Sequence, residues 1–518
     1  MKAFIKEFTK DIPRGVVSRF LNQQRAPLAK WYSPENILNN PELEYDPDNP
    51  GNKILIGALG NKLIGIEDNR HNLTGAGSRS GKSVTLINNL FFYRGSVLAT
   101  DPKGELAEKT AEARADLGQK ICILDPFNYV SDELKKYRVA YNPLSILTLD
   151  SPTVIEDASI IVDAMVVKAA GDKDPHWDES AQNLIEGIIL LVVASRQFEG
   201  QRNLITVRNL IMNALHVDYE NGDQERPYYV LEQLMLNEAQ CLKKDEKTTD
   251  IGNAIEGAAS DFYDKSDRER DGVLSTVRRH TKFLDYTAMR KILTGHDFDL
   301  ADLKRNPKGM TVYLCFPATR IEISKRWLRI FINQLLDAME REKTKPPASV
   351  LVCLDEFPAL GFVSQLQSAI GLIASFHVKL WVVLQDWNQG KALYKERWES
   401  FAANSGLMQF FNNTDVTTTE YISKLLGKTQ VIVSRHGEVN QQQKDDGITG
   451  KSGSTQLYSL MQPDEISRKF SRNDRLKRQL VIWAGYPPMI LQRVEYYDKK
   501  GPFYHLFKNK LNKAILNP

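Results

Sequence analysis

Short apolar runs recur along much of the chain, and segments with helical periodicity separate them. The runs are KILIG (53–57), SVLAT (96–100), KICIL (120–124), TVYLCF (311–316), SVLVCL (349–354), VKLWVVL (378–384) and LMQFF (407–411). Strands that alternate with helices in this way are typical of a parallel sheet with helices on its faces. The pattern therefore predicts an α/β fold with a mostly parallel, doubly wound sheet.

Several of these predicted strands end in a polar residue, at the point where the strand would give way to a loop. In a doubly wound sheet the carboxyl ends of the strands face the ligand crevice. The polar residues at these ends are Asp101, Asp125, Asp355, Gln385 and Asn412. They could therefore converge on one site.

The pattern changes between about residues 150 and 305, where the strand-like runs disappear. Helix-period segments follow one another there, among them IEDASIIVDAMVVKAA (155–170) and WDESAQNLIEGIILLVVASRQF (177–198). We interpret residues 151–305 as an all-α insertion. It would divide the α/β domain into a first part, 51–150, and a second part, 306–518.

Two further stretches are polar. Residues 1–50 become rich in Asn and Pro towards their end, which predicts a loose N-terminal arm that leads into the first strand region. Residues 434–455 are rich in Gln and Gly, which predicts a mobile loop between strands.

The segment GAGSRSGKS (75–83) has the composition and context of a phosphate-binding loop. The short strand HNLT precedes it and the helical VTLINNLFF follows it, as such a loop requires. Backbone N–H groups and the helix N-terminus would surround the β-phosphate, Lys82 would neutralise the β- and γ-phosphates, and Ser83 would complete a Mg²⁺ shell. The residues expected to contact the nucleotide are Ala76, Gly77, Ser78, Arg79, Ser80, Gly81, Lys82, Ser83 and Val84.

Ala76 stands where the first glycine of such a loop is normally found. A methyl group can be accommodated if this residue keeps an ordinary negative φ, and the glycines on either side supply local freedom. The alternative is a chance match of Gly-Lys-Ser in a loop rich in Ser and Gly. The flanking strand and helix favour a nucleotide site.

The second element of the candidate site is SVLVCLDEFPALG, in which an apolar strand ends in Asp355 and Glu356. Beside a phosphate loop, Asp355 would be placed to hold Mg²⁺ through water, and Glu356 to orient and deprotonate the attacking water. Gln385, at the end of the next strand, would contact the γ-phosphate or that water. Alone, each of these residues could equally be a solvated strand end or a hydrogen-bonding loop residue.

Other segments leave two interpretations open. In DPKGE (101–105), Lys103 and Glu105 could contact the nucleotide or a neighbouring subunit, but a tight turn at Gly104 explains them as well. The basic stretches RRHTK (278–282) and SRKFSRNDRLKRQ (467–479) could contact polynucleotide phosphates, although such runs are usually solvated helix faces.

Trp177 raises a similar choice. It is followed at helical spacing by Ala181, Leu184, Ile188 and Leu191. This spacing favours helix packing over a platform on which bases stack.

Overall composition is that of a soluble globular protein and does not by itself indicate a nucleic-acid partner. The 518 residues include 68 basic and 65 acidic side chains, a formal net charge of only +3. The four cysteines are far apart, and Cys122, Cys315 and Cys353 fall in apolar runs, so we expect neither a disulfide framework nor a metal knuckle but a reduced, cytoplasmic compartment. The longest apolar run, GIILLVVA (187–194), is far shorter than the roughly 20 residues of a membrane span.

Six spaced groups of segments resemble one family, the TraG- and TraD-like coupling proteins of type IV secretion and conjugation systems. They run in the family's order over residues 29 to about 500. The segments are LAKWYSPENI with IGALGNKLIGIEDNRHNLTGAGSRSGKS, GSVLATDPKGELAEKTAEARADLGQKICILDPF, HWDESAQNLIEGII, GVLSTVRRHTKFLDY with TVYLCFPATR, LDEFPALG with VVLQDWNQ, and SLMQPDEISRKF with GYPPMILQRVEYY.

The resemblance implies a RecA-like P-loop ATPase domain interrupted by an all-α domain, in a hexameric ring related to the FtsK and HerA translocases. Lys82 and Ser83 would bind ATP and Mg²⁺, Asp355 would coordinate the metal, Glu356 would activate water, and Gln385 would sense the γ-phosphate. The ring would sit at the cytoplasmic base of a secretion channel. The insertion would recruit protein substrates or a relaxase-DNA complex, and pore loops would grip DNA.

The chain departs from the family pattern at three points. Its phosphate loop reads AGSRSGKS where the family usually has a Gly-Pro-Thr start, and ASFHVKLWVVLQ lacks the arginine often found before the glutamine strand. Members commonly carry an N-terminal membrane anchor, whereas the part that resembles them begins here almost at Met1. Such a chain would reach the inner membrane through partner proteins of the secretion system or through an anchor that is missing.

Three functions are compatible with these features. The first is an ATPase that pumps a DNA or nucleoprotein substrate towards a type IV secretion channel, and it is favoured by PHWDESAQNL and GVLSTVRRHTKF. The second is a cytoplasmic double-stranded DNA translocase of the FtsK or HerA kind. The third is a scaffold that recruits protein substrates and hydrolyses little ATP. The sequence does not separate DNA cargo from protein cargo.

Overall fold

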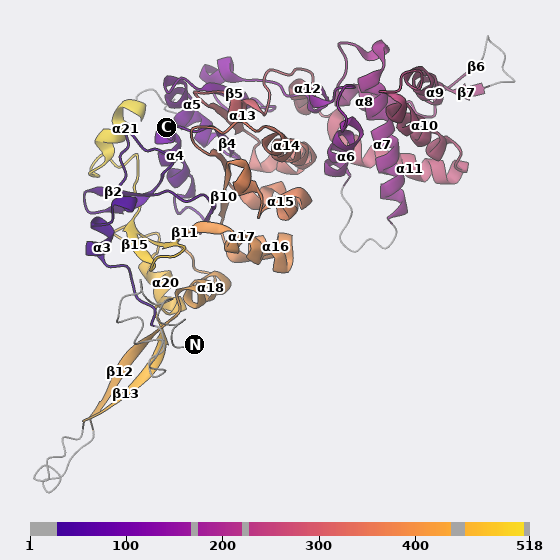
Figure 1. Ribbon diagram of the computed structural model, residues 1–518. Helices are drawn as coiled ribbons and strands as arrows, with labels where there is room; N and C mark the ends of the chain where they lie inside the picture. The colour runs from indigo at the N-terminus through magenta and orange to yellow at the C-terminus, as the bar shows by residue number, and fades with distance from the viewer. Residues whose placement is uncertain (1–27, 167–174, 220–226, 437–450, 512–518) are drawn as a thin grey trace, which may run out of the picture.

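The computed structural model describes residues 28–166, 175–219, 227–436 and 451–511. Figure 1 shows three parts: an α/β body, a helical lobe at one side of it, and a two-stranded hairpin that projects from its lower end. The candidate site lies in the body.

A mixed sheet of eleven strands runs through the described part of the body. Seven neighbouring strands are parallel, in the order β11-β3-β10-β9-β4-β8-β5. Their bounds are β11 Ser405–Phe411, β3 His71–Ala76, β10 Val378–Leu384, β9 Val350–Leu354, β4 Val97–Thr100, β8 Met310–Leu314 and β5 Lys120–Leu124. Each coincides within one or two residues with a predicted run, so the predicted mostly parallel sheet is confirmed.

Four antiparallel strands extend this sheet beyond β11, in the order β14-β15-β1-β2. They are β14 Arg478–Trp483, β15 Met489–Gln492, β1 Ile54–Leu59 and β2 Lys62–Ile66. Of these, only β1 was expected from the apolar runs. The sheet is therefore wider and more mixed than the sequence pattern predicts.

Helices cover both faces of the sheet and enclose two hydrophobic cores. On one face α4 (Lys82–Phe92), α5 (Glu105–Asp116) and α21 (Tyr504–Leu511) pack against residues such as Val97 and Leu351. The other face carries α14 Ile321–Arg341, α15 Ser364–Ala369, α16 Trp387–Tyr394, α17 Trp398–Ala403, α18 Val416–Leu426 and α20 Pro463–Lys469. Apolar residues along both faces of the parallel strands explain why those strands read as continuous apolar runs.

Between β5 and β8 the chain forms the helical lobe seen on the right of Figure 1. Its elements are α6 Val154–Met165, α7 His176–Ala194, α8 Leu204–Met212, α9 Val230–Leu242, α10 Thr249–Tyr263, α11 Asp267–Thr281 and α12 Thr287–Leu293, and the short helix α13 Asp302–Arg305 then lies in the body next to β8. A short hairpin of β6 (Val217–Tyr219) and β7 (Pro227–Tyr229) interrupts them, so the insertion is helical apart from this one pair of strands among the described residues. Strands this short carry too few residues for a period-2 pattern to be recognised.

The described part of the N-terminal arm, residues 28–50, packs against the body and is not loose. It contains α3 (Pro34–Leu38) and a turn of 3₁₀ helix, η1 (Pro41–Leu43). Ile37, Leu43 and Tyr45 are buried, and the Tyr45 ring lies so close to Gly65 of β2 that a Cβ there would be 2.3 Å from Tyr45 Cδ2. Apolar residues scattered in a polar segment thus cover the edge strand of the sheet.

The two ends of the predicted loop at 434–455 belong to a hairpin, and residues 437–450 lie outside the described residues. Strand β12 (Lys428–His436) pairs antiparallel with β13 (Lys451–Ser459). The hairpin projects away from the body (Figure 1).

A chain of buried polar side chains crosses the sheet. Trp381 Nε1 donates to Thr74 Oγ1 over 2.9 Å, and Thr74 Oγ1 donates to Gln409 Oε1 over 3.3 Å. Gln409 Nε2 and Gln479 Nε2 both donate to the carbonyl oxygen of Ile56, at 3.1 and 2.6 Å. These bonds tie the parallel strands to the antiparallel extension and fix their register, since a slipped strand would leave buried amides unpaired.

No helix among the described residues is both long and apolar enough to cross a membrane.

Candidate nucleotide-binding site

The candidate site lies at the carboxyl edge of the parallel strands, where β11, β3, β10, β9 and β4 are successive neighbours. The phosphate loop follows β3 and leads into α4, as the sequence predicted. The residues after β10 and β9 are Gln385 and Asp355, so the strand order brings the three candidate motifs together.

The loop between β3 and α4 has the backbone of an anion-binding turn. Arg79 and Gly81 both have positive φ, 54° and 90°, and α4 begins directly afterwards at Lys82. Left-handed residues next to a helix N-terminus turn backbone N–H groups towards one point, where a phosphate is favoured. The Ser80 hydroxyl is buried and has no hydrogen-bond partner among the described residues, so an acceptor or donor from a ligand would satisfy it.

Ala76 explains how the loop tolerates the loss of its usual first glycine. It is the last residue of β3, it is fully buried, and its φ is not positive, as expected. The next residue is the one that must be glycine, because a Cβ on Gly77 would lie 2.1 Å from the carbonyl oxygen of Asn412. The residue that must lack a side chain is thus Gly77, one position after the usual one.

The outer residues of the loop are held from two sides. Asn412 Nδ2 donates to the carbonyl oxygen of Ser78 over 3.2 Å, and Arg493 Nη1 donates to that of Ser80 over 2.6 Å. Val84 lies in the first turn of α4, and its N–H donates to the Gly81 carbonyl. The bonds from Asn412 and Arg493 hold the loop through its carbonyl oxygens.

Lys82, Glu356 and Gln385 form a connected group. Lys82 Nζ lies 3.7 Å from Glu356 Oε2, and Gln385 Nε2 donates to Glu356 Oε1 over 2.8 Å. Burial lowers the pKa of Lys82, and the neighbouring Glu356 partly offsets this. The ammonium group is therefore incompletely neutralised and is suited to an additional anion.

Asp355 precedes Glu356 in the chain and lies next to the start of α4. Ser83 Oγ donates to Asp355 Oδ2 over 3.3 Å, which brings together the two residues expected to hold Mg²⁺. Burial, followed by the charge of Glu356, raises the pKa of Asp355 to about 6. A hydroxyl and a carboxylate held in this way are oxygen ligands that Mg²⁺ prefers.

The backbone at Glu356 is strained. Its φ and ψ are 55° and 53°, a left-handed conformation that a residue with a Cβ adopts at a cost of about 1 kcal/mol or more. Thr100 Oγ1 donates to the Asp355 carbonyl oxygen over 2.8 Å and helps to hold the strand end. The strain directs the Glu356 side chain towards Lys82 and Gln385.

The other predicted strand-end residues divide into two groups. Asn412 contacts the phosphate loop, as described above, and Asp101 lies close enough to Asp355 for their charges to interact. Burial raises the pKa of Asp101 to about 7, and its carboxylate accepts the N–H of Ala107. Asp125 does not join the site, because it binds the backbone of its own loop, at Tyr129 and Val130.

The DPKGE segment forms a tight turn and also places Lys103 near the site. Gly104 has φ of 68° and caps α5, which begins at Glu105, so the tight turn is present. Lys103 is exposed, and its charge acts on both Lys82 and Asp355. Lys103 therefore stands at the rim of the site.

Arg493 was not identified from the sequence. It follows β15, and its guanidinium group lies 5.1 Å from the centre of the Phe411 ring while it donates to the phosphate loop. Its sequence neighbourhood, LQRVEYY, carries no motif, and 413 residues separate it from Ser80. Only the pairing of the antiparallel strands brings it here.

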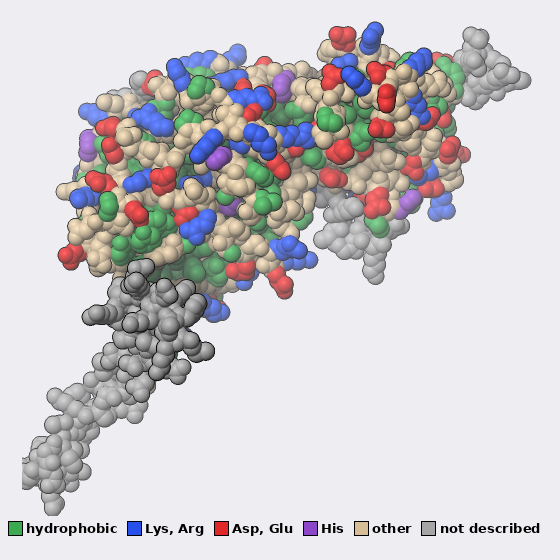
Figure 2. All heavy atoms as spheres, in the orientation of Figure 1, with side chains coloured by type: hydrophobic (Ala, Val, Ile, Leu, Met, Phe, Trp, Pro, Cys, Tyr) green, Lys and Arg blue, Asp and Glu red, His purple; other side chains and the backbone are tan. Residues whose placement is uncertain are grey.

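The basic stretches are largely engaged within the protein. In RRHTK, His280 Nε2 lies 3.0 Å from Asp178 Oδ1, and Arg278 donates to the Met212 carbonyl. In the second stretch Arg478 pairs with Asp474, while Lys477 pairs with Glu495 and Asp498. Acidic and basic side chains are mixed over the face seen in Figure 2.

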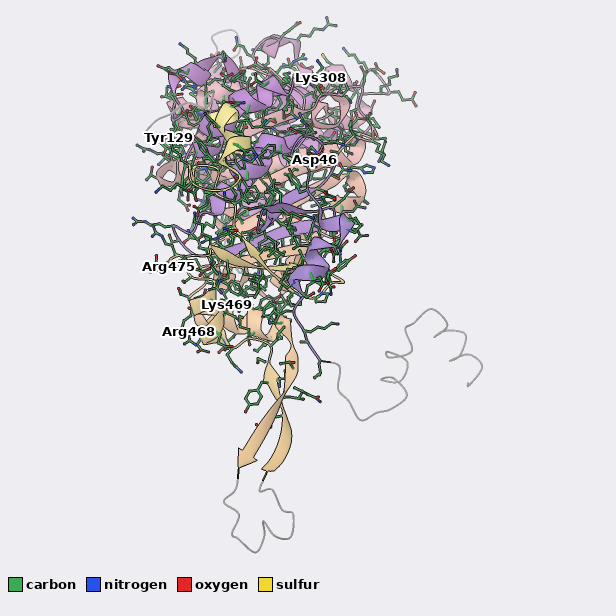
Figure 3. All side chains as sticks on the ribbon, turned by 90° about the vertical axis from the view of Figure 1, so that its left-hand side faces the viewer. Asp46, Tyr129, Lys308, Arg468, Lys469 and Arg475 are labelled. Carbon is green, nitrogen blue, oxygen red and sulfur yellow. The ribbon has the colours of Figure 1, made fainter. Side chains whose placement is uncertain are left out.

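A few basic side chains of the second stretch do face solvent. Arg468, Lys469 and Arg475 come from α20 and the loop after it, and Figure 3 places them at the lower end of the body, above the base of the hairpin. Of these, Arg468 also pairs with Asp464 within α20.

The expectation for Trp177 is confirmed. Ala181, Leu184, Ile188 and Leu191 are buried in the core of the lobe. The Trp177 ring itself covers Gly272 of α11, where a Cβ would lie 2.5 Å from Trp177 Cζ3. This residue packs two helices together.

Comparison with known proteins gives a match along nearly the whole chain. The family model described as "Type IV secretory system Conjugative DNA transfer" matches residues 19–517. Conjugal transfer protein TraG of Escherichia coli is 24% identical over 457 residues, which cover 84% of this chain and 68% of that protein. The type IV secretion system-coupling protein VirD4 of Bartonella quintana is 23% identical over 485 residues, which cover 90% and 69%.

Solved structures of the bacterial conjugative coupling protein TrwB have a similar fold. The unbound form of TrwBdeltaN70 has a TM-score of 0.61 at 12% identity, covering 92% of this chain and 98% of that one. TrwB in complex with ADP and Mg²⁺ has a TM-score of 0.59 at 13% identity, with the same coverage. At this identity the likeness concerns the fold, and it confirms the RecA-like α/β architecture of a P-loop NTPase.

Proposed function

The chain belongs to the type IV secretory system conjugative DNA transfer family, the family of the VirD4 and TraG coupling proteins, and we propose that within it this protein acts as an ATP-hydrolysing motor. The motor would recruit a DNA or nucleoprotein substrate and drive it towards the membrane channel. The observation that carries the proposal is the grouping of Lys82, Ser83, Asp355, Glu356 and Gln385 at one edge of the sheet.

The residues of the site fit ATP and Mg²⁺. The unpaired Ser80 hydroxyl, the left-handed turn at Arg79 and Gly81, and the partly neutralised Lys82 suit a polyphosphate. Ser83 and Asp355 would hold the ion. A magnesium ion bound there would neutralise charge on the phosphate oxygens during transfer.

The contact between Lys82 and Glu356 suggests how the site prepares for hydrolysis. Lys82 lies within ion-pair distance of Glu356. Phosphates compete for Lys82, so its charge would be withdrawn from Glu356 when ATP binds. Glu356, still held by Gln385, would then be free to accept a proton from the attacking water.

The wider assembly follows as part of the same proposal. The helical lobe, at residues 151–305, would recruit substrates such as a relaxase-DNA complex or proteins, and the nucleotide-binding parts would be 51–150 and 306–518, after an arm at 1–50. Copies of the chain would form a ring of six subunits, as in the related translocases, because a motor that moves a polymer benefits from closed symmetry. The ring would stand at the cytoplasmic face of the bacterial inner membrane, held by components of the secretion system.

Steady-state ATP hydrolysis by the purified protein, with and without single- and double-stranded DNA, tests the enzymatic part. Lys82→Ala and Glu356→Gln should each lower the rate by about a hundredfold or more. The exposed Lys391 and Glu420 supply matched controls, and Lys391→Ala and Glu420→Gln should retain the wild-type rate. A wild-type protein that binds nucleotide but turns over no faster than both site variants would favour a recruiting scaffold over a motor.

A second experiment separates secretion from cytoplasmic DNA translocation. Cells whose chromosomal copy is replaced by Lys82→Ala should lose transfer of DNA or protein to recipient cells and keep normal growth and chromosome segregation. The opposite result would favour a translocase of the FtsK or HerA kind.

A further inference from the structure

A cavity of about 320 Å³ lies at the junction between the helical lobe and the body, apart from the nucleotide site. The lobe contributes Asp163 of α6 and Gln182 of α7, and the body contributes residues of α14 and of the loop before α15. Its position between the two parts makes it a place where a bound group would touch both.

The cavity contains a positive charge. Arg329 of α14 lines the cavity, and its Nε is buried without a hydrogen-bond partner among the described residues. The carboxylate in the lining, Asp163, accepts a hydrogen bond from Gln182 Nε2 over 2.8 Å. Burial, and then the charge of Arg326, lowers the pKa of Arg329 to about 10, so it is still charged at neutral pH. Arg326 does not line the cavity; it donates its Nε–H to the Met165 carbonyl oxygen.

A second side chain in the cavity also lacks a partner. Asn333, one turn after Arg329, is 3% exposed, and its Oδ1 is buried without a hydrogen bond among the described residues. A native structure rarely leaves such a group unpaired unless a water or a ligand completes it. Guanidinium and amide groups side by side are the usual partners of a carboxylate or a peptide group.

Part of the cavity lining is apolar and is connected along the chain to the catalytic strand end. Val166 and Val363 line it, as does Phe362, whose side chain is 46% exposed. Phe362 and Val363 follow the 3₁₀ turn η8 (Phe357–Leu360), which begins immediately after Glu356. The Tyr394 ring contacts both Phe357 and Phe362, so this segment is held as one packed unit.

We propose that this cavity binds an acidic segment of a protein partner, with a carboxylate on Arg329 and an adjacent apolar side chain against Phe362. A duplex carries its phosphates on a broad convex surface that does not enter a cavity of this size, whereas an extended peptide does. Occupation would shift the Phe362 segment and, through η8, the orientation of Glu356. This second step rests on the proposed ATPase function, and the binding step does not.

Fluorescence anisotropy with the full-length protein tests the binding step. The probe is a short fluorescein-labelled peptide of glutamates around a single phenylalanine, and a peptide with lysines in place of the glutamates is its counterpart. Arg329→Gln should weaken probe binding by about tenfold or more, because a charged hydrogen bond is lost. Arg268→Gln, the same change on an exposed position of α11, should leave the affinity unchanged.

A second variant guards against a folding defect in Arg329→Gln. Asn333→Asp changes few atoms and adds a negative charge, so it should weaken probe binding while circular dichroism and the melting temperature stay close to wild type. Addition of the probe should change the ATPase rate of wild type and of Arg268→Gln, and should leave that of Arg329→Gln at its basal value.

Several outcomes would overturn the proposal. The probe could bind wild type and both cavity variants equally, or the lysine peptide could bind more tightly than the probe. A DNA oligonucleotide could displace the probe at a lower concentration than unlabelled peptide does, or the probe could bind only after Asp172 and Asp174 of the same chain are changed to Asn. Failure of the ATPase proposal is distinguishable, because anisotropy on Lys82→Ala still reports the cavity when no ATP is hydrolysed.

Discussion

Asp355 and Asp125 end two strands of the same sheet, after similar apolar runs, and have different roles. Asp125 accepts the N–H groups of Tyr129 and Val130 at 2.8 and 3.1 Å and lies 3.4 Å from Arg138 Nε. Among the described residues the Asp355 carboxylate receives only the long bond from Ser83, and its pKa is raised. The comparison teaches that a strand-end pattern locates the functional edge, whereas the donors around each carboxylate decide between a structural and a catalytic role.

The sharpest test of this comparison is catalytic. Asp355→Asn should lower ATP hydrolysis by about a hundredfold or more at saturating Mg-ATP, because the side chain that helps to hold the ion loses its charge. Asp125→Asn should change the rate by less than about threefold, provided the assay is run well below its melting temperature. Equal losses in the two variants would remove the distinction between them.

The second test concerns stability and should have the reverse order. Asp125→Ala should lower the free energy of unfolding by about 3 kcal/mol, because it leaves two N–H groups and the half-buried Arg138 without their acceptor. Asp132 is the control from the same loop: its side chain is 93% exposed although it lies 3.5 Å from Arg138. Asp132→Ala should cost less than about 0.5 kcal/mol in urea unfolding.

Asp101 accepts a backbone N–H, as Asp125 does, and has a raised pKa, as Asp355 does, so it allows a test by pH. The folded-state pKa of about 7 lies above the unfolded value of about 3.9, so the folded protein binds this proton more tightly. Its stabilising contribution is complete below about pH 4 and is lost as the pH rises through 7, with a loss of about 2 kcal/mol between pH 5 and pH 8. Urea unfolding of the ligand-free protein at both pH values measures this.

Asp101→Asn is the variant that completes the pH experiment. An amide can still accept the Ala107 N–H and does not ionise, so the difference in stability between pH 5 and pH 8 should shrink by about the same 2 kcal/mol. A variant with the pH dependence of wild type would show that Asp101 is ionised in both states.

The smallest expected effect is at Ala76, where the departure from the usual loop sequence should leave nucleotide affinity nearly unchanged. Ala76→Gly restores the usual loop sequence, but it should change nucleotide affinity by less than about threefold and lower stability by about 1 kcal/mol, because glycine weakens a strand. Isothermal titration with ADP and urea unfolding measure the two. Gly77→Ala is the contrasting variant and should impair binding far more, since its Cβ would meet the Asn412 carbonyl.

The parallel half of the fold could be predicted from the sequence because its strands are buried on both faces. A continuous apolar run such as VKLWVVL marks a strand and its end together, so Gln385 could be placed at the functional edge before the structure was known. The order of the strands was not predictable in the same way. It arises from packing between segments hundreds of residues apart.

The antiparallel extension and the hairpin escaped prediction for physical reasons. Strand β15 is only four residues long and has alternating burial, and in the described sheets β12 and β13 pair only with each other. Strand β14 does contain an apolar run, LVIW, which was not identified from the sequence. The contact of Arg493 with the phosphate loop depends on that extension. Its role could therefore not be predicted from local sequence.

The buried hydrogen bonds that cross the sheet have a consequence for how the protein is made. Thr74, in the strand that leads to the phosphate loop, bonds to Gln409, which is synthesised 335 residues later. The carbonyl oxygen of Ile56 bonds to Gln479, which is synthesised later still. Contacts of such sequence separation form slowly, and the strand edges stay unpaired until both partners have left the ribosome. A nascent chain would therefore acquire its nucleotide site only near the end of translation, which makes the newly made N-terminal part a natural client for chaperones.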